Sequence, residues 1–183
     1  MAYLTDRHVF IHIYKTGGNS IRKMLPPGIE IGGVHSCAPD VLKDTRTKGK
    51  FMFSVVRDPY RWTYSLYTYI KRTGHPLSGT VNSMSFYEFV KYLRDVLMKR
   101  EWKSMGNNYT SQTTATQGCD KVYRLEDIIK DSTQFCKELS IPVQKIPFHN
   151  SNPDQSVQEC RLSRDLIQEI FADDYQNFGY DIK

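Results

Sequence analysis

Continuous apolar runs of strand length recur along the chain. The clearest are Val9–Ile13, Phe51–Val56 and the segment KVYRL that ends before Glu126, and a shorter run, IEI, begins at Ile29. Their β-branched and aromatic content predicts strands. The run Phe51–Val56 has no polar alternation except one serine, which is typical of a strand covered on both faces.

Helical spacing of apolar residues follows most of these runs. The expected helices are NSIRKML, which Pro26 and Pro27 end, APDVLKDT, about 60–71, SFYEFVKYLRDVL, EDIIKDSTQFCKEL and about 164–172. Ser85 with Glu88 three residues later predicts a capping box. The segment 73–83 holds glycine, proline and polar residues, so a loop is expected there.

Strands that alternate with helices favour an α/β fold with a mostly parallel sheet flanked by helices. The length of 183 residues suits a single domain spanning 1–183. In such sheets ligands bind at the carboxyl ends of the strands. Lys15 and Arg57 each stand just past the end of a predicted strand, so both are candidate ligand-binding residues.

The net charge of +5 and the pI of about 8.9 mildly favour anionic partners, but on charge alone a solvated basic surface is the preferred explanation. Cys37, Cys119, Cys136 and Cys160 show no metal-like spacing, so we expect mostly free thiols and no metal site, with disulfides left open. The chain has no apolar run long enough to span a membrane and no cleavable leader pattern, so a soluble, cytoplasmic protein is expected.

The segment YKTGGNS, 14–20, has the composition of a phosphate-binding turn. Gly17 and Gly18 allow a sharp turn and a close approach of the backbone to a ligand. Asn19 and Ser20 are able to cap the following helix, and Lys15 adds a full positive charge. The alternative is a structural Gly-Gly turn beside a surface lysine.

The segment SVVRDPYRWTYSLY offers a second set of anion-binding groups. Arg57 ends a buried strand, and Ser65 lies about two helical turns into the next helix. A guanidinium and a hydroxyl placed in this way suit one phosphate. In the alternative interpretation, Arg57 pairs with Asp58 or another nearby carboxylate, and Ser65 has no role.

Together the two segments resemble a known family, the sulfotransferases, and within it the carbohydrate type that includes the heparan 2-O-sulfotransferases. IYKTGGNSI resembles their 5′-phosphosulfate loop and FSVVRDPYRWTYSLY their 3′-phosphate motif. SQTTATQGCDKVYRLEDI, IPFHNSNP and FADDYQNFGYD resemble later elements of the family, in the same order. The chain departs from the family pattern at Tyr14, where proline is usual, and at Asn19, where threonine is usual.

The resemblance implies a P-loop-like three-layer fold and the cofactor 3′-phosphoadenosine 5′-phosphosulfate, without a metal. Residues of the loop would surround the 5′-phosphosulfate, namely Lys15, Thr16, Gly17, Gly18, Asn19 and Ser20. Arg57 and Ser65 would hold the 3′-phosphate. Lys15 would also neutralise charge on the bridging oxygen as the sulfuryl group leaves.

Transfer to an acceptor hydroxyl also needs a base. The resembled heparan enzymes place a catalytic histidine between the phosphosulfate loop and the Arg-Asp-Pro strand, and His35 matches that position. Its alternative is a half-buried histidine bonded to the backbone. Glu30 is the second candidate, Glu126 is expected to support the site through hydrogen bonds, and His75 is expected to be exposed.

The sequence therefore predicts sulfuryl transfer to an acceptor hydroxyl, most simply on a carbohydrate. A nucleotide or small-molecule kinase is the main alternative, but no Gly-Lys-Ser/Thr occurs in the chain. A catalytically silent nucleotide- or glycan-binding module is a third possibility. Nucleic-acid binding ranks last because no basic stripe with interleaved aromatic residues is present.

Overall fold

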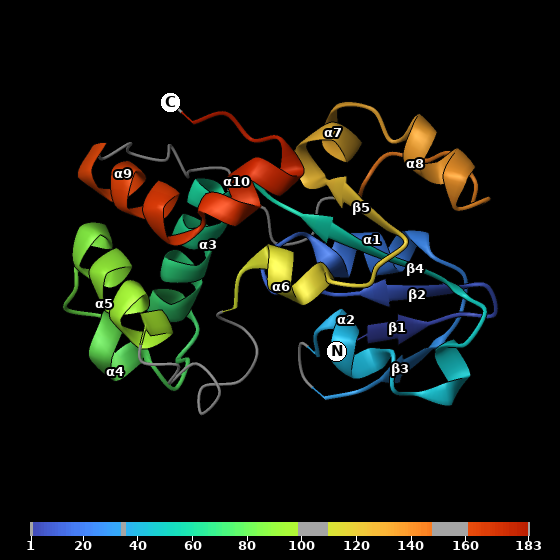
Figure 1. The fold of residues 1–183 in the computed structure, drawn as a ribbon, viewed down its shortest axis with the longest axis horizontal. Coiled ribbons are helices and arrows are strands. Elements are labelled where there is room, and N and C mark those ends of the chain that lie inside the picture. The colour runs from blue at the N-terminus through green and yellow to red at the C-terminus, as the bar shows by residue number, and fades with distance from the viewer. Residues whose placement is uncertain (1, 34–35, 99–109, 148–160, 183) are drawn as a thin grey trace.

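A mixed β-sheet forms the centre of the computed structural model, which describes residues 2–33, 36–98, 110–147 and 161–182 (Figure 1). In these ranges the five strands, in the order β3-β1-β2-β4-β5, are Ile29–Ile31, Ala2–Leu4, His8–Ile11, Phe51–Val56 and Lys121–Arg124. β2, β4 and β5 are parallel, whereas β1 is antiparallel to both of its neighbours. The sheet is therefore mixed, and the expectation of a mostly parallel sheet holds only for β2, β4 and β5.

Helices follow most of the strands. In chain order they are α1 Gly18–Met24, α2 Ala38–Val41, α3 Pro59–Arg72, α4 Ser78–Val81, α5 Phe86–Met98, α6 Gln112–Thr116, α7 Leu125–Lys130, α8 Thr133–Glu138, α9 Arg161–Ile170 and α10 Ala172–Phe178, with a short 3-10 turn at Thr45–Thr47. Within the described ranges no helix has both the length and the apolar character that a membrane crossing requires.

Alternate residues of β2 and β4 pack against helices on opposite faces of the sheet. Phe10 and Phe53 lie in a cluster with side chains from α1, α7 and α8. Val9 and Met52 lie in a second cluster with side chains from α2. Because successive side chains of a strand point to opposite faces, these two strands need apolar residues at almost every position, as their sequences show.

A third cluster joins α3, α5 and α9 beside the sheet. Trp62 and Leu66 of α3 are fully buried and lie in this cluster with Phe89 of α5 and Ile167 of α9. Figure 1 shows these helices, with α4, grouped at one side of the sheet. The loop that follows β2 therefore has the sheet on one side and α3 on the other.

Several expected elements have different bounds in the structure. The single helix expected from EDIIKDSTQFCKEL is two helices, because the backbone is extended at Asp131 and its side chain accepts a hydrogen bond from the Thr133 N–H (2.8 Å). The expected loop 73–83 contains the short α4. The capping box is confirmed: Glu88 accepts the Ser85 N–H (2.7 Å), and Ser85 Oγ accepts the Glu88 N–H (3.3 Å).

Candidate anion-binding site

Lys15 and Arg57 lie together at the carboxyl ends of two adjacent parallel strands. β2 ends at Ile11, four residues before Lys15, and β4 ends at Val56, directly before Arg57. One guanidinium nitrogen, Nη1 of Arg57, lies 3.4 Å from the carbonyl oxygen of Lys15. The structure thus brings the Arg57 guanidinium to the backbone of Lys15, 42 positions away, and near enough to its ammonium group to lower the pKa of Lys15.

The loop between β2 and α1 has a backbone that only certain residues adopt easily. Gly17 has φ 80°, and Lys15, unusually for a residue with a side chain, has φ 63°. A Cβ added at Gly18 would overlap the ring of His12, and one added at Gly17 would lie 2.9 Å from Leu125. The two glycines therefore permit close packing and not only a turn.

Asn19 and Ser20 do not cap α1, contrary to the expectation. Gly17 is the N-cap residue, and Asn19 and Ser20 lie inside the first turn of the helix. Asn19 is exposed and Ser20 is buried. Thr16, also buried, donates its hydroxyl proton to the Ile13 carbonyl (2.9 Å), so its side chain closes the turn.

The ammonium group of Lys15 is in an unfavourable environment for a cation. It is half-buried, and burial together with the nearby Arg57 lowers the pKa of Lys15 from 10.5 to about 8. No carboxylate in the described part of the chain forms an ion pair with Lys15. The ring of Tyr69 partly compensates for this, with 4.3 Å between Nζ and the ring centroid. An anion at this position would relieve the electrostatic cost.

The main chain of Arg57 is held by Gln112 at the start of α6. The Arg57 N–H donates to Gln112 Oε1 and Gln112 Nε2 donates to the Arg57 carbonyl, each at 2.8 Å. Burial lowers the pKa of Arg57 despite a favourable field from Glu126. Asp58 accepts the Arg61 N–H (2.8 Å) and caps α3, and no ion pair of Arg57 is present among the described residues. The carboxylates of Glu126 and Asp58 nevertheless favour the charged form of Arg57 and oppose the lowering of its pKa by burial, so the alternative of a nearby carboxylate partner stays open.

The C-terminal segment holds this arrangement in place. Glu126 accepts the Asp58 N–H (3.0 Å) and the Tyr180 hydroxyl (3.0 Å), which agrees with its expected supporting role. Asp174 is fully buried and accepts the N–H groups of Gln112 (3.0 Å) and Thr113 (2.7 Å). Burial raises the pKa of Asp174, and these two hydrogen bonds oppose the shift. Residues near the end of the chain thus fix the start of α6 and, through it, Arg57.

The described structure does not link Ser65 or Glu30 to Lys15 and Arg57, and it does not cover His35. Ser65 is half-buried on α3, and in the described ranges its hydroxyl has no recorded hydrogen bond to Lys15 or Arg57. Glu30 is exposed in β3 and hydrogen bonds with Arg22. His35, the expected base, lies outside the described residues, as does Cys160. Cys37, Cys119 and Cys136 are free thiols, as expected for them.

Tyr69 and His75 were missed by the sequence reasoning. His75 is half-buried rather than exposed, and its ring centroid lies 6.3 Å from that of Tyr69. Tyr69 reaches the loop because α3 packs beside it, and His75 contacts Tyr69. One signal was available, since Tyr69 follows Ser65 by four residues and so lies on the same face of α3.

A separate cavity of about 510 Å³ lies along the open edge of β5, away from Lys15. Its lining includes Lys121 of β5, Phe135 of α8 and Phe178 of α10. Neither Lys15 nor the glycine loop borders it.

Comparison with known proteins adds nothing to the geometry. No protein-family model matches the chain, no curated protein matches it, and no solved structure matches it.

Proposed function

We propose that the chain is a sulfotransferase that uses 3′-phosphoadenosine 5′-phosphosulfate and acts on a hydroxyl of a carbohydrate acceptor. The observation that carries the proposal is the contact of the Arg57 guanidinium with the Lys15 carbonyl at the carboxyl ends of β2 and β4, which places both residues at one edge of the sheet. Two neighbouring positive charges, with burial lowering the pKa of each, favour an anion between or beside them. The motifs around both residues support a phosphosulfate nucleotide as that anion.

The residues present fit such a cofactor. Gly17 and Gly18 make room for Leu125 and His12 in the protein, so the support for the cofactor comes from the charges of Lys15 and Arg57 and from the motifs around them. Lys15 would bind the 5′-phosphosulfate with the loop 16–20, and Arg57, with Ser65, the 3′-phosphate. Arg57 offers several donors in a planar fork, which suits a phosphate. The bound cofactor supplies an activated sulfuryl group for in-line transfer.

Lys15 has the catalytic role in this proposal. With a pKa of about 8, its side chain is mostly protonated at neutral pH, so it is able to stabilise negative charge as it develops on an oxygen nearby. We assign the acceptor proton to His35, on the positional match alone. Glu30 is the weaker candidate because Arg22 occupies its carboxylate.

The proposal is tested by the thermal stability of the protein with 3′-phosphoadenosine 5′-phosphate, compared with ATP and magnesium. A ligand that binds only the folded state raises the melting temperature. We expect the 3′-phosphorylated nucleotide to raise the Tm of the wild-type protein, and Lys15→Met to abolish most of that rise. Lys15→Met keeps the length of the side chain but removes its charge.

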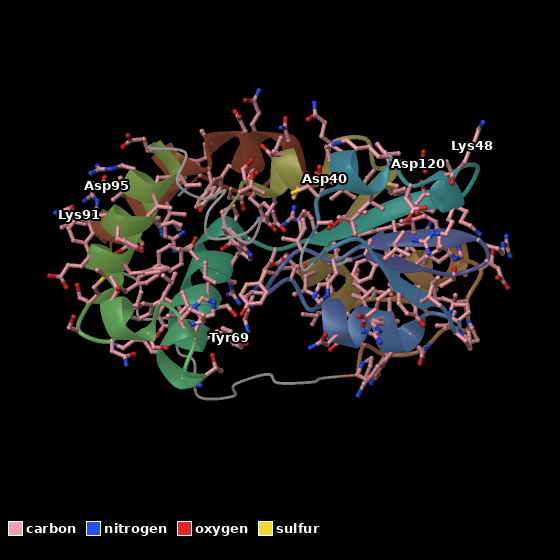
Figure 2. The ribbon with its side chains drawn as sticks, turned by 90° about the horizontal axis from the view of Figure 1, so that it is seen from below. Asp40, Lys48, Tyr69, Lys91, Asp95 and Asp120 are labelled. Atoms are coloured by element: carbon pink, nitrogen blue, oxygen red, sulfur yellow. The ribbon has the colours of Figure 1, made fainter. Side chains whose placement is uncertain are left out.

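The matched control is Lys48→Met, which removes the same charge at the other end of β4. Lys48 is exposed and precedes β4, whereas Arg57 follows it, so the six-residue strand, about 20 Å long, separates the two positions. Figure 2 shows Lys48 far from Tyr69. A rise in Tm with ATP–magnesium alone, or an equal loss in both variants, would refute the proposal.

A further inference from the structure

The ring of Tyr69 covers the ammonium group of Lys15. Nζ lies 4.3 Å from the centroid of the Tyr69 ring and 5.9 Å from that of Tyr14. Both distances are within the range of cation–π attraction. The two rings meet edge to face, with centroids 5.3 Å apart and planes at 89°. The Lys15 ammonium group therefore contacts two tyrosine rings that are perpendicular to each other.

Hydrogen bonds also connect the backbone around Lys15 to residues in α3 or just before it. The Tyr14 carbonyl accepts a hydrogen bond from Nε1 of Trp62, which lies on α3, at 2.6 Å. The Lys15 carbonyl lies 3.4 Å from Nη1 of Arg57, which is two residues before the start of that helix. A backbone φ of 63° is strained for a residue with a side chain, so the surrounding contacts must hold Lys15 in this conformation. These contacts aim the Lys15 side chain at α3.

The position of Tyr69 is also fixed. It lies near the end of the 14-residue helix α3, which buries Trp62, Leu66 and Ile70 in the helical core. Its ring has Tyr14 and His75 as aromatic neighbours. Figure 2 shows Tyr69 on α3, between the helical part of the molecule and the sheet. A ring that is packed in this way is a rigid support for a flexible side chain.

We propose that Tyr69 is a positioning residue for Lys15, holding its ammonium group at the glycine loop before the anionic ligand arrives. A lysine side chain has large rotamer freedom, and ordering it on binding weakens affinity. The ring orders the side chain in advance and leaves N–H groups of Nζ for the ligand. Tyr14, which stands where the resembled family has proline, contributes the second ring. The inference rests on the proposed function for the identity of the ligand.

A double-mutant cycle tests this role. The variants are Tyr69→Leu, Lys15→Met and the pair, with the affinity for 3′-phosphoadenosine 5′-phosphate measured by calorimetry. The cost of ordering one lysine side chain predicts that Tyr69→Leu weakens binding by about 2- to 13-fold, and that Tyr69→Phe, which keeps a ring, restores most of the affinity. In the Lys15→Met background, Tyr69→Leu should have no further effect. If Tyr69→Leu reduces the nucleotide affinity equally in the wild-type and Lys15→Met proteins, Tyr69 affects only the fold, and the inference is overturned.

A second cycle needs no ligand and separates this inference from the proposed function. The same variants are unfolded with urea, and the coupling between Lys15 and Tyr69 should change the unfolding equilibrium constant by about 2- to 30-fold. Absence of coupling would overturn the inference whatever the protein binds. Coupling without any binding of the nucleotide would support the contact and refute the proposed function.

Tyr87 and Lys91 provide a matched control pair. Nζ of Lys91 lies 5.8 Å from the ring of Tyr87, and both residues belong to α5, outside the site. Figure 2 shows Lys91 at the end of the molecule that is opposite to Lys48. Tyr87→Leu should leave the nucleotide affinity unchanged. A loss that matches that of Tyr69→Leu would show that the affinity follows general stability, which would contradict the positioning role.

Discussion

Lys15 should make the affinity for the nucleotide depend on pH. Burial and the charge of Arg57 lower the pKa of Lys15 from 10.5 to about 8 in the free protein. A bound anion favours the protonated amine, so the pKa of Lys15 rises in the complex. Above about pH 8, binding therefore takes up a proton, and Kd should increase by up to about tenfold per pH unit until the pKa of the complex is reached.

The phosphates of the ligand do not hide this effect. Their second ionisation has a pKa of about 6, so they are fully charged above about pH 7, and their own titration changes affinity in the opposite direction. Calorimetric titrations with 3′-phosphoadenosine 5′-phosphate from about pH 6.5 to about pH 9.5 cover both regions. Repeating them in buffers of different ionisation enthalpy counts the protons that are taken up.

The stability of the free protein should follow the opposite trend. Between about pH 8 and pH 10.5 the unfolded chain binds more protons at Lys15 than the folded chain does, so the contribution of Lys15 to the free energy of unfolding rises with pH. Lys15→Met should remove both trends, and Lys48→Met should preserve them. A Kd that stays constant through this window, or one that still rises in Lys15→Met, would refute the reasoning.

Two further substitutions test the supports of the site. Gly18→Ala should destabilise the protein by about 1–3 kcal/mol in urea unfolding because the new methyl group meets the His12 ring. Gly79→Ala is its control: that helical position has open space, so the change should be neutral or stabilising by up to about 1 kcal/mol. Gln112→Ala leaves the N–H and carbonyl of Arg57 without these partners, so it should cost about 1–3 kcal/mol and weaken nucleotide binding in calorimetry. Unchanged stability in Gly18→Ala or Gln112→Ala would contradict the packing or hydrogen bonding described.

Local patterns predicted the elements whose signals are local. The strand Phe51–Val56 has the expected bounds because a continuous apolar run ends at Arg57 and Pro59. The capping box at Ser85 needs only residues that are three positions apart. By contrast, β1 is only three residues long, and its pairing with β2 and β3 defines it more than its composition does.

The sequence likewise predicted only part of the candidate site. Lys15 and Arg57 follow strands that are adjacent and parallel, so the position of a strand end is enough to bring them together. The contact between Lys15 and Tyr69 depends on how α3 packs beside the loop, which no spacing rule encodes. The supports that Glu126 and Asp174 supply likewise join segments that are 60 or more positions apart.

The most direct test of the proposed function is transfer of a labelled sulfuryl group from 3′-phosphoadenosine 5′-phosphosulfate to a panel of oligosaccharides. We expect label on an acceptor hydroxyl, formed in equal amount with 3′-phosphoadenosine 5′-phosphate, and a severe loss of transfer in Lys15→Met but not in Lys48→Met. Transfer that survives in Lys15→Met would contradict the central role of Lys15. Failure of the wild-type protein to bind or use the cofactor with any acceptor would contradict the proposed function itself.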